Sequence, residues 1–427
     1  MGNIGKRRFF YYLVILILIS SLLMIAHNNA RRFLSYQYLW GPFFLLCLFI
    51  FDSKIYTDKK LLLVIFGGIL YFGILQHILW RFTDDWYKNS LTSDFRSLLF
   101  SLSIYVYLKN NKYLFEWNKL AKIGFVFFLI TGFMTIIATA ISPLIVRASY
   151  SSIRESIEDY NLIIRLGFGS YGYMTALVVL LPILVYFTKQ KKQTWLSNRI
   201  LIIIIIFLYI VTLRAQIFAN ILIASVILIL SFVGAKKFSI TFFSMVVLTI
   251  IIFIIPINTW VESINFLSNK FEPNGIIHYK LNDMAIFIQD PVLEGTTGAG
   301  SRGLRYVELF NVFIKKPFLG DASYYNPFNK ELALGGHLYW MSRLTLLGIG
   351  GFMAYLTIIA IIFKNVLSMF DSEFKYYYLL SILSVILLGL LKNIIWLELW
   401  LILLIIIPGL YFNKYLLQVN QKNKFVF

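Results

Sequence analysis

Apolar runs of about twenty residues recur along this chain, and breaks that carry Lys or Arg separate them. A helix of that length crosses the hydrocarbon core of a bilayer and satisfies its backbone N–H and C=O groups internally. Hydrophobic residues make up 59% of the 427 residues and charged residues 14%, whereas a soluble domain carries about 25% charged residues. The sequence therefore excludes a water-soluble globular protein and predicts an all-α, polytopic helical membrane protein.

The apolar runs predict about twelve transmembrane helices. They lie near residues 9–26, 33–51, 61–80, 95–108, 123–146, 171–187, 200–213, 215–233, 238–257, 338–363, 379–395 and 397–412. The pairs 200–213/215–233 and 379–395/397–412 are predicted to be tight helical hairpins. We expect residues 1–257 to form a transmembrane bundle of spans 1–9, and residues 338–427 to form spans 10–12 and a cytoplasmic tail.

The basic residues predict the orientation of these spans. With the N-terminus in the cytoplasm, the inward breaks carry about 21 Lys and Arg residues and the short outward breaks about eight. An excess of basic residues is typical of cytoplasmic loops, so both termini are predicted to face the cytoplasm. The formal net charge of +19 does not indicate a nucleic-acid partner, because the basic residues lie in loops rather than on one soluble face.

The outward breaks carry arginine almost exclusively, whereas the inward breaks are rich in lysine. Lysine is a solvated point charge that suits anionic lipid heads, and arginine is a planar fork that suits phosphate or carboxylate. The outward arginines, which include Arg147 and Arg165, therefore indicate an anionic ligand on that side. The alternative for Arg31, Arg32 and Arg81 is a place among lipid head groups.

One break is much longer than the others. Residues 258–337 are predicted to form a large extracytoplasmic loop, of a length that is usually functional or disordered. Its many aromatic residues argue against disorder, and its sequence predicts a helix over 302–314 with Ser301 as the N-cap. We expect this helix to rest on the bundle through an apolar face formed by Leu304, Val307, Leu309, Phe310 and Phe313.

Three arginines are candidate ligands for an anion. Arg214 ends one predicted span at a tight turn, and Arg302 and Arg305 lie three apart in the first turn of the loop helix. A glycine-rich approach precedes that turn, and its backbone N–H groups also attract anions. Acidic residues are favoured in a first turn, so a bound polyanion would resolve the mismatch. The alternatives are snorkelling of Arg214 and a solvated helix face for the loop pair.

His337 lies where the long loop re-enters the membrane, in the motif Gly335-Gly336-His337-Leu338-Tyr339-Trp340. An imidazole can act there as a general base near neutral pH, or it can be an interfacial side chain bonded to lipid or backbone. No metal motif and no nucleotide phosphate loop occurs in the sequence, so we expect catalysis without metal or cofactor. The loop carboxylates could each serve as base or as salt-bridge partner: Asp283, Asp290, Glu294 and Glu308.

An outward group of arginines with one imidazole suits a donor whose leaving group is a lipid pyrophosphate. In this hypothesis an acceptor hydroxyl attacks the donor sugar while His337 helps to remove its proton. The energy of the reaction then arrives with the donor.

These motifs resemble the O-antigen polymerase and O-antigen ligase superfamily of bacterial envelope glycosyltransferases. The resemblance covers roughly residues 200–363 in order and topology. The residues that carry it are Thr212–Arg214, Gly300–Arg305, Phe313–Gly320, Gly335–Trp340 and Leu347–Phe352.

The resemblance implies a GT-C-like helical bundle in the bacterial cytoplasmic membrane. Such a protein acts on the outer membrane face, with undecaprenyl-pyrophosphate-linked oligosaccharides as donor and acceptor. By position, Arg214 and Arg302 resemble the pyrophosphate-binding arginines of the family, with Arg305 beside them, and His337 resembles the histidine linked to acceptor activation. Tyr339 of the same motif is an additional candidate. Membrane lipids and a chain-length regulator protein are candidate partners.

Three functions remain open at this point. The Gly-Gly-His-x-Tyr-Trp motif and the short approach from Pro317 look more like those of polymerases, which elongate a glycan on its lipid carrier. A ligase would instead transfer finished glycan to lipid A core. A flippase would carry charge through its spans, whereas the charges within these spans are few, mainly Arg343 and Lys392. A non-catalytic binding or scaffold role is a further alternative.

Overall fold

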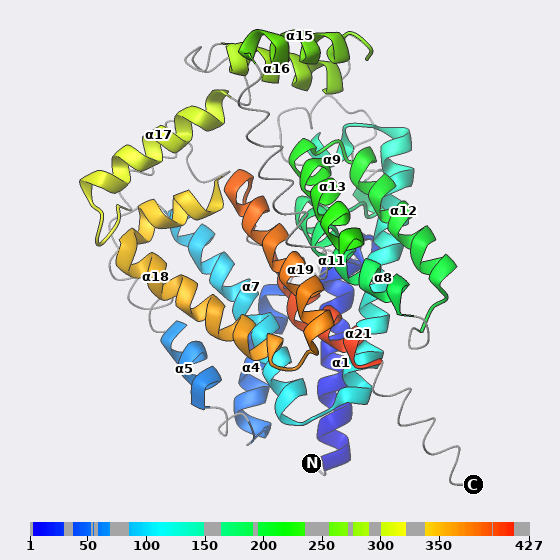
Figure 1. Cartoon of the computed structure of the whole chain (residues 1–427). Coiled ribbons are helices and arrows are strands. Elements are labelled where there is room, and N and C mark those ends of the chain that lie inside the picture. The colour runs from blue at the N-terminus through cyan, green and yellow to red at the C-terminus, as the bar shows by residue number, and fades with distance from the viewer. Residues whose placement is uncertain are drawn as a thin grey trace. The chain divides into compact units, whose positions relative to one another are not determined.

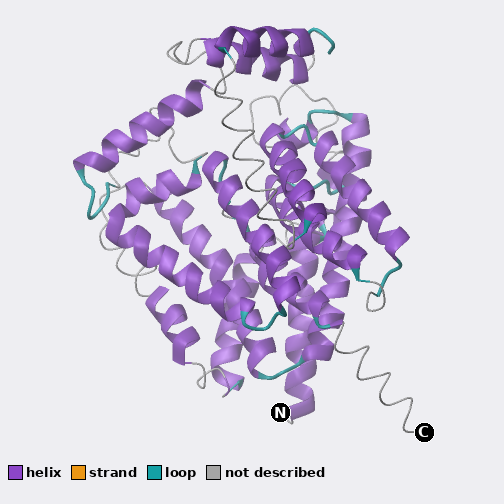
Figure 2. Cartoon of the chain, viewed as in Figure 1, coloured by secondary structure: helices purple, strands orange, loops and turns teal. Residues whose placement is uncertain are grey.

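Every regular element that the structure describes is helical, and the described residues contain no strand (Figures 1 and 2). The structure is a computed structural model, and it describes residues 3–29, 37–52, 54, 59–68, 85–148, 164–190, 195–234, 256–271, 276–289, 300–321, 338–394 and 396–413. The prediction of an all-α chain is confirmed for these residues.

The helices follow the predicted apolar runs closely. In chain order they are α1 (Asn3–Leu22), α2 (Met24–Asn29), α4 (Gln37–Phe51), α5 (Lys59–Gly68), α7 (Asp85–Asn110), α8 (Leu114–Ile141), α9 (Ile145–Ala148), α11 (Tyr171–Lys189), α12 (Asn198–Arg214), α13 (Phe218–Val233), α15 (Ile257–Ser268), α16 (Ile276–Gln289), α17 (Gly300–Lys315), α18 (Tyr339–Leu367), α19 (Ser372–Leu391), α20 (Leu397–Leu401), the π-helical turn η7 (Ile402–Ile406) and α21 (Ile407–Tyr411). Most of the predicted span at 238–257 lies outside the described residues.

Among the described residues, four helices are long and apolar enough to cross a membrane: α8, α11, α18 and α19. Shorter apolar stretches lie at Pro42–Phe51, Phe218–Val233 and Leu397–Tyr411. The chain is therefore a membrane-embedded helical protein. The count of about twelve spans stays a prediction.

The chain divides into two compact units, which we describe one at a time. Unit 1 consists of residues 1–231, 358–388 and 394–427, and unit 2 of residues 232–357 and 389–393. The long helix α18 contributes its first part to unit 2 and its last part to unit 1.

Helix α11 is the buried centre of unit 1. All its residues from Gly172 to Phe187 are buried, as expected of a helix that is apolar all round. It packs against α12, α20 and η7, while α8 packs against α1, α21 and η7. Ser170 caps its first turn, because its hydroxyl accepts a hydrogen bond from the Tyr173 N–H at 3.2 Å.

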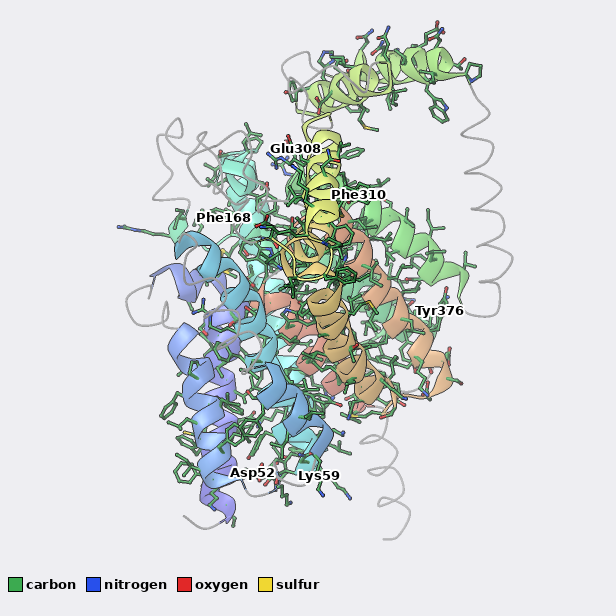
Figure 3. All side chains as sticks on the ribbon, turned by 90° about the vertical axis from the view of Figure 1, so that its left-hand side faces the viewer. Asp52, Lys59, Phe168, Glu308, Phe310 and Tyr376 are labelled. Atoms are coloured by element: carbon green, nitrogen blue, oxygen red, sulfur yellow. The ribbon has the colours of Figure 1, made fainter. Side chains whose placement is uncertain are left out.

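The predicted inward breaks gather at one end of unit 1. Arg7 near the start of α1 pairs with Glu116 at the start of α8. The turn between α7 and α8 contacts the end of α4, where the Asn111 amide donates to Asp52 at 2.7 Å. Asp52 and Lys59 lie at this end, and Phe168 lies at the opposite end (Figure 3). The start of α1, the end of α4 and the turn between α7 and α8 therefore lie at one end of unit 1, and the compartment that this end faces stays a prediction.

In unit 2, α17 packs against the beginning of α18. Leu309 and Leu338 are buried together, with Tyr306 and Met341 against them. The Thr345 hydroxyl donates to the Leu309 carbonyl oxygen at 3.0 Å and so ties the two helices together. The long predicted loop thus includes a helix that is anchored to the start of a span.

Two expectations for α17 are wrong. The helix begins at Gly300, so Ser301 lies in its first turn and is not its N-cap. The buried residues are Leu309 and Val312, whereas Val307 and Phe310 of the predicted contact face are 58% and 52% exposed. Phe310 lies on the side of α17 opposite Glu308 (Figure 3). The reason is that α17 is apolar on two sides, and only one of them packs against α18.

The turn that follows α17 forms hydrogen bonds with α18 where the helical backbone of α18 is interrupted. Gly348 leaves the helical conformation, with φ +64° and ψ 178°. The freed Ile349 N–H donates to the Pro317 carbonyl oxygen at 2.7 Å, and the Asp321 N–H donates to the Thr345 carbonyl oxygen at 3.0 Å. Two of the motifs that carry the resemblance, Phe313–Gly320 and Leu347–Phe352, are therefore in contact.

The Gly320→Ala variant should be clearly less stable than the parent. A Cβ atom at Gly320 would lie 2.0 Å from the Leu346 carbonyl oxygen, and its φ is +74°. We expect a loss of about 1–3 kcal/mol, measured as a lower unfolding temperature of the purified protein in detergent. Gly350→Ala is the matched control, because its nearest atom would lie 3.6 Å away. Equal unfolding temperatures for the two variants would contradict the tight contact.

Candidate functional site

Arg214 is the last residue of α12, and it lies at a turn of a few residues before α13. A cation at this position interacts favourably with the negative end of the helix dipole. The turn is tight, and Gln216 adopts a positive φ of 52° to close it. The predicted hairpin with Arg214 at its tip is therefore present in unit 1.

The Arg214 guanidinium is held by the end of another helix. Its Nη2 donates to the Thr139 carbonyl oxygen at 2.6 Å, three residues before the end of α8 at Ser142. Carbonyls in the last turn of a helix lack a partner within that helix, so Arg214 caps α8 as well as α12. The side chain is nevertheless exposed, and a guanidinium carries five N–H donors. The bond to Thr139 thus orients the cation and leaves most of its donors for a ligand.

Buried threonines form a polar line on α8 beneath Arg214. Thr131, Thr135 and Thr139 lie four residues apart and are all buried. Each of the latter two donates its hydroxyl to the carbonyl oxygen one turn earlier. The Gly169 N–H donates to the Thr135 hydroxyl at 2.7 Å, which ties the start of α11 to the same line.

This line leads to a carboxylate that the sequence analysis missed. The Ser170 hydroxyl donates to Glu398 Oε1 at 3.3 Å, and Glu398 lies in the first turn of α20. The signal was present, because an acidic residue inside the apolar run 397–412 is unusual in a span.

Two further outward arginines of unit 1, Arg147 and Arg165, follow α8 in the chain. Arg147 is in α9, directly after α8, and its side chain lies outside the described part of the structure. Arg165 is exposed and precedes the Gly169 contact with α8 by four residues. Both therefore belong to the connection between the end of α8 and the start of α11.

The loop candidates lie in unit 2. Arg302 and Arg305 are both in the first two turns of α17; the Arg305 side chain is half-buried, and that of Arg302 is not described. Asp283 is buried in α16, and Glu308 is on α17. Several other candidates lie outside the described residues altogether: Arg31, Arg32, Arg81, Asp290, Glu294 and His337.

The backbone directly after His337 is firmly held. Leu338 has a φ of +60°, which is rare for a residue other than glycine, and it is buried against Leu309. Tyr339 begins α18, and its N–H donates to the Lys392 carbonyl oxygen at 3.3 Å. Such backbone outliers cluster at functional sites, and this one lies next to the predicted catalytic histidine.

Tyr339 is itself a buried anchor. Its side chain is 2% exposed, and its hydroxyl lies 2.6 Å from the Tyr355 hydroxyl in a hydrogen bond. The Arg343 guanidinium lies 4.8 Å from the centre of its ring. Arg343 and Lys392 are 5% and 7% exposed, so two buried cations accompany Tyr339 in unit 2. The sequence analysis had noted these two only as charges within spans, although ionisable groups at such depth are functional candidates by default.

Tyr306 connects α17 to the end of α19 within unit 2. Its hydroxyl donates to the Leu390 carbonyl oxygen. Burial raises the pKa of Tyr306, so the hydroxyl keeps its proton and this bond at physiological pH.

The predicted site residues thus form two groups. Unit 1 holds Arg214, Arg147 and Arg165, and unit 2 brings the helix of Arg302 and Arg305 beside Tyr339. Within the described segments, no three His, Cys, Asp or Glu side chains gather as a metal site would require. Comparison with protein-family models and with curated protein sequences finds no match to this chain.

The Tyr339–Tyr355 pair should show strong coupling in stability. Tyr339→Phe removes the buried partner of the Tyr355 hydroxyl, and we expect it to destabilise the protein by about 1–2 kcal/mol. The Tyr339→Phe/Tyr355→Phe double variant removes both hydroxyls, so its loss should be well below the sum of the two single losses. Unfolding temperatures in detergent measure this difference, and strictly additive losses would show that the hydroxyls do not depend on each other.

Proposed function

We propose that this protein is a glycosyltransferase that polymerises undecaprenyl-pyrophosphate-linked oligosaccharide repeat units of an O-antigen, capsule or exopolysaccharide. It would act on the outer face of the bacterial cytoplasmic membrane, with both termini in the cytoplasm and a GT-C-like arrangement of its spans. The observation that carries the proposal is the Arg214 guanidinium, which is exposed yet oriented by the end of α8.

A pyrophosphate is the ligand that this arrangement suits best. Arginine binds phosphate oxygens through two parallel N–H donors, and such charge-assisted bonds are about twice as strong as neutral ones. A cation fixed where the leaving group gains charge stabilises the transition state more than the ground state. In unit 2, Arg302 and Arg305 are proposed to contact a diphosphate of a lipid-linked substrate.

The proposed reaction needs no cofactor. The acceptor hydroxyl oxygen attacks the anomeric carbon of the donor sugar and forms the new glycosidic bond. The bond from that carbon to the pyrophosphate oxygen breaks, and its electron pair leaves with the lipid pyrophosphate. His337 is proposed to take the proton of the hydroxyl. The growing glycan ends on the acceptor carrier, and free undecaprenyl pyrophosphate is released.

Reconstitution of the purified chain into lipid vesicles tests the proposal. With a synthetic lipid-linked repeat unit as the sole substrate and no added nucleotide, a polymerase should produce carriers with two or more repeat units. Transfer only to added lipid A core would indicate an O-antigen ligase. Movement of the substrate across the vesicle membrane without elongation would indicate a flippase.

Arg214→Ala should reduce the rate of polymer formation by about a hundredfold or more. The variant removes a charge-assisted contact to the pyrophosphate in the transition state and leaves its developing charge uncompensated. Arg199→Ala is the matched control: Arg199 is also exposed, at the other end of α12, and this variant should keep the parental rate. The readout is polymer formed per amount of folded protein. Parental polymer length and rate in Arg214→Ala would remove the observation on which the proposal depends.

His337→Gln should retain binding of the lipid-linked donor while turnover falls by about a hundredfold, the usual range for loss of a general base. Donor binding and single-turnover rates, measured on the same preparation, separate the two effects. An unaltered rate in His337→Gln would assign the histidine a structural role.

A further inference from the structure

The first turn of α13 contains a buried amide without hydrogen bonds. Asn220 is 1% exposed, and neither its Nδ2 nor its Oδ1 has a partner among the residues that the structure describes. Gln216 Oε1, in the turn before α13, is also buried and unpartnered over the same described ranges. Buried side-chain amides in native proteins are almost always bonded, so each exception calls for an explanation.

The backbone of this turn is unusual as well. Gln216 has a φ of +52°, a conformation that residues with side chains rarely adopt. Strained backbone persists where the surrounding structure enforces it, and it clusters at binding sites. The turn therefore combines a strained backbone at Gln216 with an unpartnered buried amide at Asn220. A glycine at position 216 would avoid the first, and an apolar residue at position 220 would avoid the second.

These amides follow Arg214 closely in the chain, by two and six residues. All three side chains belong to one hairpin of unit 1, and their intervening neighbours are apolar: Ala215, Ile217 and Ala219 are buried, and Phe218 is exposed. The apolar neighbours supply no side-chain hydrogen bond to the amides. A ligand that Arg214 holds would therefore bring polar atoms to the only unsatisfied side-chain groups of this hairpin in the described structure.

The chemistry of the amide indicates what kind of ligand group binds it. An amide presents both donors and an acceptor, whereas the oxygens of an ionised phosphate only accept. A phosphate would leave Asn220 Oδ1 and Gln216 Oε1 unsatisfied. A hydroxyl both donates and accepts, so it can satisfy either end of the amide. This conclusion also holds if the nitrogen and oxygen of Asn220 are exchanged, because neither atom has a partner.

We propose that Asn220 and Gln216 bind hydroxyl groups of the sugar that adjoins the pyrophosphate held by Arg214. The inference rests on the proposed function and deepens it: Arg214 recognises the charge of the carrier, and the two amides recognise the first sugar. Because Asn220 is 1% exposed, the turn at Gln216 must shift when the sugar binds, and the positive φ is released by that shift. Both amides are specificity residues, and the acceptor base lies elsewhere.

The first test is the sign of a stability change in the purified full-length protein. Asn220→Leu replaces an unsatisfied amide by an apolar group of similar volume, so it should raise the unfolding temperature in detergent. Asn118→Leu is the matched control: Asn118 is also buried, but its Nδ2 donates to the Gly409 carbonyl oxygen at 2.8 Å. It should lower the unfolding temperature. A fall of similar size in both variants would mean that ordered water satisfies Asn220, and it would overturn the proposal.

The second test compares binding of two probes: undecaprenyl pyrophosphate with one sugar attached, and undecaprenyl pyrophosphate without sugar. Asn220→Leu should weaken binding of the glycosylated probe by about tenfold and leave binding of the bare probe unchanged. Arg214→Ala should weaken binding of both. Gln216→Gly is an independent variant if Asn220→Leu does not fold. It removes the second side-chain amide, and glycine adopts the positive φ at this position without strain.

The outcomes separate the two proposals. Parental affinity of Asn220→Leu and Gln216→Gly for the glycosylated probe would overturn the amide site while the proposed function stands. Parental protein that binds neither pyrophosphate would overturn the proposed function, and the amide site with it.

Discussion

Backbone N–H and C=O groups at membrane depth need partners within the protein, because the hydrocarbon core offers none. The structure meets this requirement at two described places where a helix ends or breaks. The break of α18 at Gly348 is satisfied by the Pro317 carbonyl oxygen, and the end of α8 is satisfied by Arg214. Threonines on α8 return their hydroxyls to the carbonyls one turn earlier. At these two described places, a specific side chain or turn completes the irregular backbone.

The same contacts bring polar groups to the places where a ligand can use them. Arg214 is fixed because the end of α8 needs a donor, and the fixed guanidinium then presents its other donors outward. In unit 2, the buried Leu338 and Tyr339 hold the chain directly after His337. Preorganisation of this kind lets a site stabilise developing charge without moving first. In the function we propose, one set of residues meets both the demands of folding in a bilayer and those of binding a diphosphate.

The sequence predicts local features of this protein well and contacts between distant segments poorly. Apolar runs set the positions of α8, α11 and α19, and the pattern around 302–314 predicts α17 to within two residues. The predicted contact face of α17 was wrong, because the helical repeat of 3.6 residues does not show which of two apolar sides packs against the neighbouring helix. The insertion of Pro317 at Gly348 was not predicted, because it depends on a pairing about thirty residues apart that no local pattern encodes. Asn220 was overlooked for a related reason: only burial reveals that its amide has no partner.

Charge alone does not let a membrane enzyme choose its substrate. Every lipid carrier of the proposed class presents a diphosphate, so an arginine in the role we propose for Arg214 would bind bare and glycosylated carriers alike. To distinguish the two carriers, a site needs groups that stay without hydrogen bonds when the bare carrier binds. A site that is built to bond a ligand hydroxyl rejects a ligand without that hydroxyl far more strongly than an apolar pocket rejects a ligand that does not match it. Asn220 and Gln216 are such groups, placed within six residues of the cation. Burying them without partners is unfavourable in the free protein, and that loss is the physical source of the selectivity we propose, because only a sugar relieves it.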